Sequence, residues 1–440
     1  MPKIAFVGAG SFVFARRLVT DLLTWPSLQG SVIALMDLNE EKLGTMTALA
    51  RRMVTQAGTG AQIVSTTDLR EALDGADYVA VSIRVGSDRH NVEIPMRYGI
   101  DQAIGDTAGP GGVFYFLRNA PALLDIARTM QEVCPGALML NYTNPMVMLS
   151  WAVTAATDIA YVGLCHSVQG TAMHLAEYIG APFDEVSYWT AGINHMAWYL
   201  KFLWNGQDAY PLLWKAMEDP EIYKQDIVRW EVMKHFGAFV TESSVHMSEY
   251  VPYFRRTPEL VDRHTDEAMW AVPPKGTTRE QRRAMWRERR RQQEEENQQL
   301  AFGDGPIPIE RSHEYFSRIL NAVETNAPYV FNGNVPNTDL ITNLPGTTGG
   351  RTAVVEVPIM VDGCGLHPCH VGNLPPALAA LNRSNLVVEE LAVKGYLEKD
   401  RESIYRAVQL DPLTASLLSL AEIREMVTEM FAAHEAYIDF

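Results

Sequence analysis

The chain has 440 residues, roughly two to three times the size of an ordinary domain, so it can bury a large core. Its composition, 47% hydrophobic and 20% charged residues, excludes collagen-like, coiled-coil and wholly disordered proteins. The 37 lysines and arginines stand against 53 aspartates and glutamates, and the formal charge of −16 argues against nucleic acid or an anionic membrane as a partner.

The first 160 residues alternate short apolar runs with amphipathic stretches. This alternation is typical of strands and helices in a parallel, doubly wound sheet. We expect strands over residues 3–10, 32–38, 61–67, 78–83, 136–145 and 160–165, and helices over residues 14–25, 40–58, 69–74 and 120–133.

The pattern changes after about residue 190, where segments become longer, more helical and richer in tryptophan and tyrosine. We therefore expect two domains, over residues 1–190 and 191–440, the second of mixed α/β structure. Residues 273–300 predict one long charged helix, with basic residues first and acidic residues after. We interpret it as a solvated or interface-covering helix rather than a nucleic-acid-binding arm.

Three features bear on the compartment. Four cysteines without a CxxC pair do not form a disulfide framework, which favours the reducing cytoplasm. The N-terminal sequence MPKIAFVGAG lacks the long apolar core of a secretory signal. Residues 133–157 carry no charge, but the polar stretch NYTNP interrupts them, which argues against a membrane span.

The sequence GAGS at residues 8–11 follows the first expected strand and opens a helix. Glycines at such a turn let the backbone approach a pyrophosphate, although Val13 replaces the third glycine of the full pattern. Asp37 closes the second strand, where an acidic residue binds the adenosine ribose and favours NAD. We predict a Rossmann-like, doubly wound parallel sheet holding NAD, followed by a mixed α/β (α+β) domain. The predicted cofactor residues are Gly8, Gly10, Ser11 and Asp37.

A cysteine and a histidine suggest a metal site. Cys165 follows an expected strand, at the edge where doubly wound folds bind ligands, and His195 comes 30 residues later. Together they could supply two metal ligands and leave positions open for substrate oxygens. The spacing alone leaves open the ordinary alternative of a buried apolar thiol and a hydrogen-bonded core imidazole.

Three further stretches carry polar residues that suit a binding cleft. Asn144 ends an expected strand before a proline, with its amide aimed into the cleft or in an Asx turn. Residues 105–112, GDTAGPGG, predict a glycine-rich loop that carries Asp106. Residues 242–253 concentrate titratable side chains, at His246, Glu249 and Tyr250.

At these residues the chain resembles glycoside hydrolase family 4, and within it the melibiase-type α-galactosidases. The supporting stretches are FVGAGS, DTAGPGG, LNYTNPM, LCHSVQGTA, AGINHMA, TESSVHMSEY and NLP followed by VEVP, which occur in the family's order. The resemblance implies an NAD- and divalent-metal-dependent enzyme that hydrolyses unphosphorylated α-galactosides of the melibiose and raffinose type. It also implies a homodimer or homotetramer, whose second domain holds substrate, metal and the subunit contacts.

The resemblance further implies a mechanism and residue roles. NAD⁺ oxidises the sugar at C3, a base removes the C2 proton, the aglycone leaves C1, water adds and the hydride returns, without net turnover of NAD. His166 occupies the position where phospho-α-glucosidase relatives carry an acidic proton donor. The implied Mn²⁺ ligands are Cys165 and His195, and the implied substrate-binding residues are Arg89, Asp106, Asn144 and Asn194.

One position departs from the family pattern. Phosphoglycosidase relatives place the base tyrosine four residues before another tyrosine, whereas this chain has His246 there and Tyr250 after it. An imidazole could remove the C2 proton, and so could Tyr250 if the backbone is shifted. Both residues therefore stay candidates for the catalytic base.

Other functions remain open at this level. Within the family, the alternatives are an α-glucosidase and an α-glycuronidase, although a uronic acid would need a cationic pocket that the sequence does not locate. An NAD-dependent 2-hydroxy-acid dehydrogenase fits the glycine turn but not the Cys–His pair. A non-catalytic NAD-binding redox sensor would use Cys165 as its switch, and sugar cleavage would exclude it.

Overall fold

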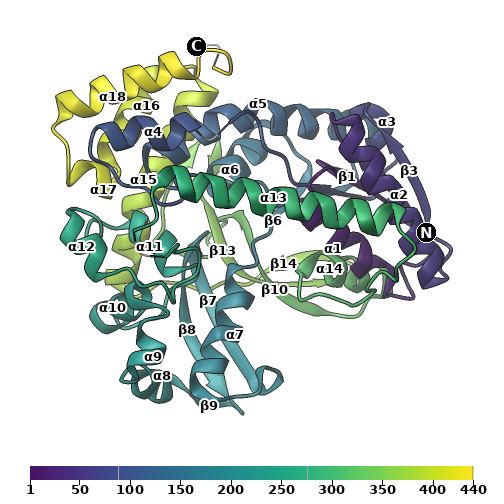
Figure 1. Cartoon of the computed structure of the whole chain (residues 1–440), viewed down its shortest axis with the longest axis horizontal. Helices are drawn as coiled ribbons and strands as arrows, with labels where there is room; N and C mark the ends of the chain where they lie inside the picture. Colours follow the sequence, from purple (N-terminus) through teal and green to yellow (C-terminus); the bar gives the residue numbers. More distant parts are fainter. Residues whose placement is uncertain (88, 275, 439) are drawn as a thin grey trace.

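Six parallel strands build the first half of the fold in the computed structural model, which describes residues 1–87, 89–274, 276–438 and 440 (Figure 1). They follow the order β3-β2-β1-β4-β5-β6, with helices as crossovers, so the expected Rossmann-like sheet is confirmed. The strands are β1 (Lys3–Val7), β2 (Val32–Met36), β3 (Gln62–Thr66), β4 (Tyr78–Val81), β5 (Leu138–Asn141) and β6 (Ala160–Gly163). The helices among them are α1 (Phe12–Leu23), α2 (Glu40–Ala57), α3 (Leu69–Leu73), α4 (Arg89–Arg97), α5 (Gly109–Val133) and α6 (Met146–Ala156).

Three of these helices differ from the sequence-based expectation. The helix expected over residues 120–133 begins at Gly109, so the second half of the predicted loop 105–112 is helical, and that prediction was wrong. Glycine at these positions serves close packing and does not mark a loop, because a Cβ atom at Gly112 would lie 2.2 Å from the carbonyl oxygen of Thr107. Helices α4 and α6 were not expected from the sequence.

The second half of the chain extends the same sheet with strands β10, β13, β7, β8 and β9, which run antiparallel to their neighbours, and β14 pairs with β13. One row of paired residues crosses the junction: Gly163, Asn334, Glu356 and Gly192. This arrangement confirms the expected mixed α/β class. These strands are β7 (Val186–Ile193), β8 (Met196–Trp204), β9 (Gln207–Asp208), β10 (Tyr329–Pro336), β13 (Val354–Asp362) and β14 (Gly365–Pro368), and β11 (Thr347–Thr348) pairs separately with β12 (Arg351–Thr352).

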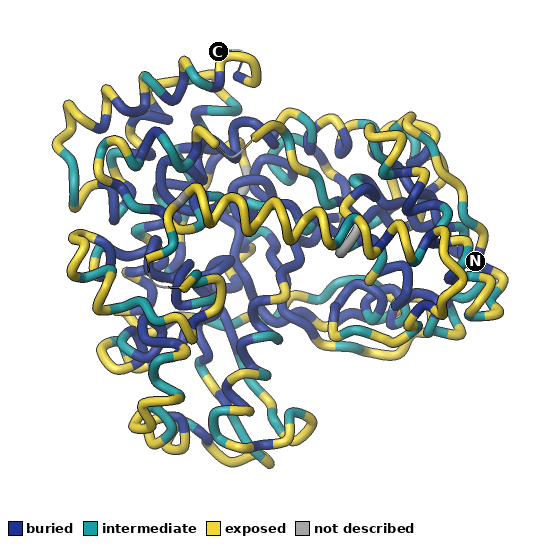
Figure 2. Tube along the Cα trace, in the orientation of Figure 1, coloured by how far each residue is buried: buried dark blue, intermediate teal, exposed yellow. Residues whose placement is uncertain are grey.

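Helices cover the ends and the outside of this sheet, and the strands inside it are mostly buried (Figure 2). Besides those already given, they are α7 (Ser167–Ile179), α8 (Tyr210–Ala216), α9 (Pro220–Tyr223), α10 (Ile227–Phe236), α11 (Ser244–Tyr250), α12 (Pro258–Arg263), α13 (Arg279–Phe302), α14 (Tyr315–Thr325), α15 (Pro376–Leu397), α16 (Arg401–Leu410), α17 (Pro412–Ala415) and α18 (Leu420–Ala433), with a short 3₁₀ turn η1 (Phe183–Glu185). Across the described residues, no helix is both long and apolar enough to cross a membrane.

Helix α13 is the charged helix expected from the sequence. It starts with a capping box between Thr278 and Gln281 and lies along α2, exposed over most of its length (Figures 1 and 2). Its acidic end pairs with α2, since Lys42 reaches Glu294 at 2.8 Å. Helix α13 therefore covers the outer face of α1 and α2, in agreement with the predicted solvated, covering helix.

Candidate active site

The predicted site residues come together because their strands are neighbours in the sheet. Gly8 follows β1, Asn144 follows β5 and Cys165 follows β6, and the carboxyl ends of these parallel strands share one edge. The row of paired residues that crosses the sheet reaches Gly192, and His195 follows three residues later. Sheet pairing thus joins the loop after β6 to the turn after β7.

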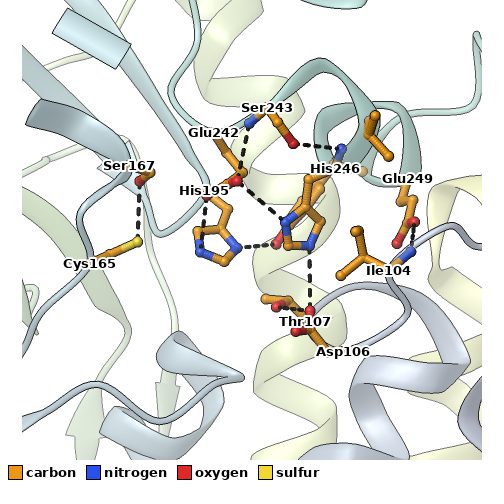
Figure 3. A network of polar contacts seen from close by, with 12 residues as sticks. Ile104, Asp106, Thr107, Cys165, Ser167, His195, Glu242, Ser243, His246 and Glu249 are labelled. Atoms are coloured by element: carbon orange, nitrogen blue, oxygen red, sulfur yellow. Dashed lines mark hydrogen bonds and ion pairs between the residues drawn. The ribbon is translucent and has the colours of Figure 1, made fainter. Parts of the chain in front are cut away.

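Cys165, His195 and Glu242 form a compact set of metal-ligating groups (Figure 3). One ligand atom from each, a thiol sulfur, an imidazole nitrogen and a carboxylate oxygen, lies within 4.8 Å of the other two. Nε2 of His195 is 3.4 Å from Oε2 of Glu242, and the Cys165 thiol donates to Oγ of Ser167 at 3.3 Å. We call these three residues the ligand cluster.

Two members of the ligand cluster have unusual backbone conformations. φ is 63° at His195, in the two-residue turn between β7 and β8, and 70° at Glu242. Left-handed backbone is uncommon for residues other than glycine, and such strained conformations gather at functional sites. A tight hairpin turn ordinarily includes φ > 0, which accounts for His195, so the backbone of Glu242 is the conformation that points to a functional site here.

The two candidate bases lie on α11, beside the ligand cluster. The His246 ring is 4.7 Å from the His195 ring, and the Tyr250 hydroxyl is 3.4 Å from Nδ1 of His195. His246 lies between two carboxylates, with Nε2 3.6 Å from Oδ1 of Asp106 and Nδ1 3.8 Å from Oε1 of Glu242 (Figure 3). Both candidates thus border the metal-ligating groups.

Charge coupling within the site shifts several pKa values. Burial opposes the charged form of Glu242, but the imidazoles of His195 and His246 outweigh it and hold the pKa of Glu242 below its ordinary value. Burial likewise disfavours charged His246, yet contact with Glu242 raises its pKa above the ordinary value. Burial raises the pKa of the Cys165 thiol to about 11, and a coordinated cation would reverse this by deprotonating the thiol.

Several buried polar atoms of the predicted site lack a well-formed hydrogen bond. Among the described residues, these are Oδ1 of Asn144, both amide heteroatoms of Asn194 and both carboxylate oxygens of Glu356, although the Asn194 amide approaches Cys165 and Glu356 closely enough to oppose the rise of their pKa values. Each such group costs about 1–3 kcal/mol when left unpaired, so their concentration here calls for a ligand. Asn144 and Asn194 are two of the residues predicted to bind sugar hydroxyls.

The predicted cofactor residues form a tight turn between β1 and α1. Gly8 has φ of 89°, and a Cβ atom there would lie 2.1 Å from the carbonyl oxygen of Ser82. The N–H of Gly10 donates to Oδ2 of Asp37 at 2.7 Å, which leaves no space for a side chain at position 10. Ser11 is exposed at the start of α1. A turn with so little space for side chains fits the close approach of a pyrophosphate, and Asp37 at the end of β2 stands where the adenosine ribose would bind.

Two predicted residues lie at the margin of the site. Arg89 begins α4, is exposed and pairs with Glu93 at 2.7 Å, and none of the contacts described for it reaches the ligand cluster. His166 follows Cys165 and is exposed, and it lines a cavity that Glu242 also lines. Their roles in substrate binding and acid catalysis stay predictions.

Two carboxylates of the site, Glu242 and Glu356, were not predicted from the sequence, and a third, Glu249, had no predicted role. Glu356 interrupts the apolar strand β13, and an acidic residue in a buried strand is the signal that could have found it. Glu242 precedes a helix start, where acidic residues are common, so it gave no distinct signal. Glu249, noted but unassigned, accepts the N–H groups of Ile104 and Gly105 at 2.7 and 3.1 Å and so holds the loop before α5.

Sequence profiles and relatives match nearly the whole chain. Residues 3–181 match the profile described as family 4 glycosyl hydrolase, and residues 190–414 match that of the family 4 glycosyl hydrolase C-terminal domain. An α-galactosidase of Bacillus subtilis (strain 168) is 40% identical over 441 residues, 99% of this chain and 98% of its own. An α-galactosidase of Rhizobium meliloti (strain 1021) is 36% identical over 445 residues, 99% of this chain and 89% of its own.

The fold also occurs among solved structures. A 6-phospho-α-glucosidase from gut microorganisms, solved in complex with NAD and Mn²⁺, matches with a TM-score of 0.80 at 19% identity. The match covers 99% of each chain. At this identity the similarity concerns the fold, including the sheet that joins both halves of the chain.

Proposed function

The chain belongs to family 4 of the glycosyl hydrolases, and we propose that it is an NAD- and Mn²⁺-dependent α-galactosidase that acts on unphosphorylated α-galactosides. The observation that carries this proposal is the ligand cluster, which stands at the sheet edge that also holds the glycine turn after β1. A glycosidase that relies on two carboxylates needs neither feature. The two α-galactosidase relatives support a galactoside as the substrate.

The residues present fit both implied groups. The dinucleotide would lie on Gly8 and Gly10 beside Asp37, and the cation would bind the ligand cluster. When bound, NAD⁺ supplies reversible oxidation of a sugar carbon, and the cation supplies Lewis-acid stabilisation of sugar oxygens. A thiolate by itself favours zinc or cobalt, whereas the Glu242 carboxylate is the hard oxygen ligand that suits Mn²⁺.

The chain's own residues hold the sugar and move its protons. His246 or Tyr250 takes the proton from C2, because both lie against His195 at the cluster. His166 supplies a proton to the departing oxygen from the rim of the cavity. Arg89 would have to leave Glu93 to take part. The residues proposed to bind sugar hydroxyls are Arg89, Asp106, Asn144 and Asn194.

The organisation of the enzyme is proposed from composition and from the change of sequence pattern near residue 190. We place an NAD-binding domain at residues 1–190 and a domain for substrate, metal and oligomerisation at 191–440. We also propose a cytoplasmic homodimer or homotetramer, since buried free thiols such as Cys165 suit a reducing compartment. Light scattering of the purified chain measures its mass in solution, and the mass of a monomer would contradict the proposed homodimer or homotetramer.

Hydrolysis of p-nitrophenyl α-galactoside tests the proposed function. Activity should require NAD⁺, Mn²⁺ and a thiol reductant together, and it should exceed that on the α-glucoside and on the α-galacturonide. Activity after complete removal of NAD would contradict the cofactor, and preference for another glycoside would contradict the substrate. Accumulation of NADH with a hydroxy acid would instead favour the dehydrogenase.

A further inference from the structure

A cavity of about 460 Å³ opens beside the ligand cluster, and among its described lining residues His166 and Glu242 are the two that have a role in the function proposed above. Its volume lies within the range of roughly 300–1,000 Å³ that is typical of small-molecule sites. Glu242 and His166 line its near end, and helices α7 and α10 form its walls. A cavity of this size beside the ligand cluster can hold a small molecule or part of a substrate.

Helix α7 presents two contrasting faces. Its apolar face, with Ala172 and Leu175, packs in a buried cluster against β8 and α10. The face toward the cavity is polar and repeats at helical spacing. It consists of Ser167, Gly170, Thr171, His174, Glu177 and Tyr178. A polar face on a cavity, with hydroxyl, imidazole and carboxylate groups in one row, suits a ligand rich in hydroxyl groups.

The floor of the cavity is a buried ion pair that is already satisfied. Arg229, 3% exposed, donates from Nε to Oδ1 of Asp226 at 2.7 Å and from Nη1 to Oγ1 of Thr171 at 2.7 Å. The Tyr178 hydroxyl donates to Oδ2 of Asp226 at 2.6 Å. Among the lining residues described, Arg229 is the one with a permanent positive charge, and Asp226 neutralises it.

The rest of the lining described includes the carboxylate of Glu177, the imidazoles of His166 and His174, and the indole of Trp270, which is 60% exposed although it lines the cavity. An exposed indole offers a flat apolar surface for the C–H face of a sugar ring. Glu242 belongs to the ligand cluster, so the carboxylate left to face an occupant is that of Glu177. An anionic ligand would meet this carboxylate and no free guanidinium, so the chemistry favours a neutral sugar.

The strand order sets the position of this cavity relative to the glycine turn. The turn follows β1, the sugar-facing Asn144 follows β5, and Cys165 follows β6. Helix α7 comes after β6 and packs on β7, on the side of the ligand cluster away from β1. A substrate held at the ligand cluster therefore has the dinucleotide turn on one side and the cavity on the other.

We propose that this cavity is the subsite for the leaving group of the α-galactoside and that it accepts a neutral sugar. The inference rests on the proposed function, because a leaving group exists only if the enzyme cleaves glycosides. It adds a specificity determinant, the face of α7 with Trp270, to the residues that hold the reacting galactose.

Gly170 offers a direct test of the leaving-group subsite. A Cβ atom at this helical position would meet nothing within 4 Å, so Gly170→Leu fills the cavity without disturbing the helix. Gly44→Leu is the matched control, because Gly44 lies in α2 with equally open surroundings. Rates are compared for galactose α-linked to glucose and for methyl α-galactoside, whose leaving group needs no subsite.

Gly170→Leu should lower kcat/KM for the disaccharide by at least about tenfold, the effect of losing one or two hydrogen bonds. It should leave kcat/KM for methyl α-galactoside and the melting temperature unchanged, and Gly44→Leu should alter neither substrate. Equal losses on both substrates, or no loss on the disaccharide, would overturn the subsite. If the unmodified enzyme cleaves neither galactoside, the proposed function itself fails.

A second comparison tests the preference for a neutral leaving group. The enzyme should cleave galactosyl-glucose at least about tenfold better than the same disaccharide carrying a 6-phosphate on glucose. Glu177→Gln should narrow this ratio by removing one carboxylate from the wall, whereas Glu425→Gln, on the exposed face of α18, should not. Equal cleavage of the two disaccharides by the unmodified enzyme would overturn the charge preference.

Discussion

Several residues of the site are ionisable side chains in positions where burial disfavours their charged form. Glu242 and Glu356 place carboxylates beside a thiol and two imidazoles, although buried acids are uncommon unless paired. Glu242 also adopts left-handed backbone. Such costs are retained where a ligand compensates them, which is why the ligand cluster explains these residues better than core packing does.

Substitution of one metal-binding side chain should abolish metal binding while the fold stays intact. Cys165→Ser and His195→Ala should each eliminate bound Mn²⁺ and activity, and Glu242→Gln should also lower the affinity for Mn²⁺, because a neutral amide oxygen is a weaker ligand than a carboxylate. Metal content after gel filtration, measured by mass spectrometry, checks the loss independently of activity. The control is Cys364→Ser, because that thiol is exposed and remote in sequence. Full metal content in either of the first two variants would make the pair structural.

Glu389 should make stability depend on pH. Burial raises its pKa to about 8, and one carboxylate oxygen has no partner among the described residues. Between its ordinary pKa of 4.5 and about 8, the folded protein keeps a proton that the unfolded chain has released. Stability therefore falls as pH rises through this window, by about 1.4 kcal/mol per pH unit for this group.

Glu389→Gln should remove that contribution. Its melting temperature should fall less than that of the unmodified protein as pH rises from about 5 to about 8. Glu425→Gln, an exposed substitution, should retain the original pH dependence. Parallel curves for Glu389→Gln and the unmodified protein would show that Glu389 does not titrate in this window.

Among secondary-structure elements, the turn between β1 and α1 illustrates how one local motif serves two purposes. Gly10 donates to Asp37, so the acid that ends β2 also fixes the glycine turn. Helix α5 shows the opposite case, because the glycines at its start serve close packing and do not mark a loop. Similar glycine content thus leads to a cofactor turn in one place and to a close helix contact in the other.

Asp37→Ala should weaken NAD⁺ binding by about 1–3 kcal/mol, through loss of charge-assisted hydrogen bonds and of the contact with Gly10. Titration calorimetry with the purified chain measures this directly. Asp125→Ala, an exposed change on α5, is the control and should bind NAD⁺ normally. An unchanged affinity for Asp37→Ala would remove Asp37 from the cofactor site.

For the whole molecule, one continuous sheet is what brings the two chemistries together. The parallel half carries the glycine turn and Cys165, and the antiparallel half carries His195 and Glu356. Pairing of β6 with β10 and of β13 with β7 joins them. Oxidation of a sugar and removal of its C2 proton require the glycine turn and the ligand cluster to lie close together. Neither half of the sheet carries both of them by itself.

The mechanism should therefore exchange the C2 hydrogen of the substrate with solvent. A substrate deuterated at C2 should lose its label during turnover. Either His246→Ala or Tyr250→Phe should suppress this loss, and the variant that does so identifies the base. Nuclear magnetic resonance of the product measures the retained label. Complete retention after many turnovers, together with activity in an NAD-free preparation, would contradict oxidation and elimination.

The amino-acid sequence by itself determined the fold class, the glycine turn, the Cys–His pair and the family resemblance. Apolar runs of strand length between amphipathic stretches predict a doubly wound sheet because these periods are local properties of the chain. Gly8, Gly10 and Asp37 could also be predicted locally, because they lie at the ends of predicted strands. Cys165 stood out because it follows a predicted strand, and His195 because it comes 30 residues later in one of the stretches that resemble the family.

Only the tertiary structure decided which residues meet around that pair. Glu242 joins the ligand cluster from a segment 47 residues after His195, and Glu356 reaches it through the register of β13 against β7. Register and loop packing depend on contacts between residues distant in sequence, which no local period encodes. The cavity along α7 has the same origin, because its second wall, α10, comes to it through packing and not through sequence proximity.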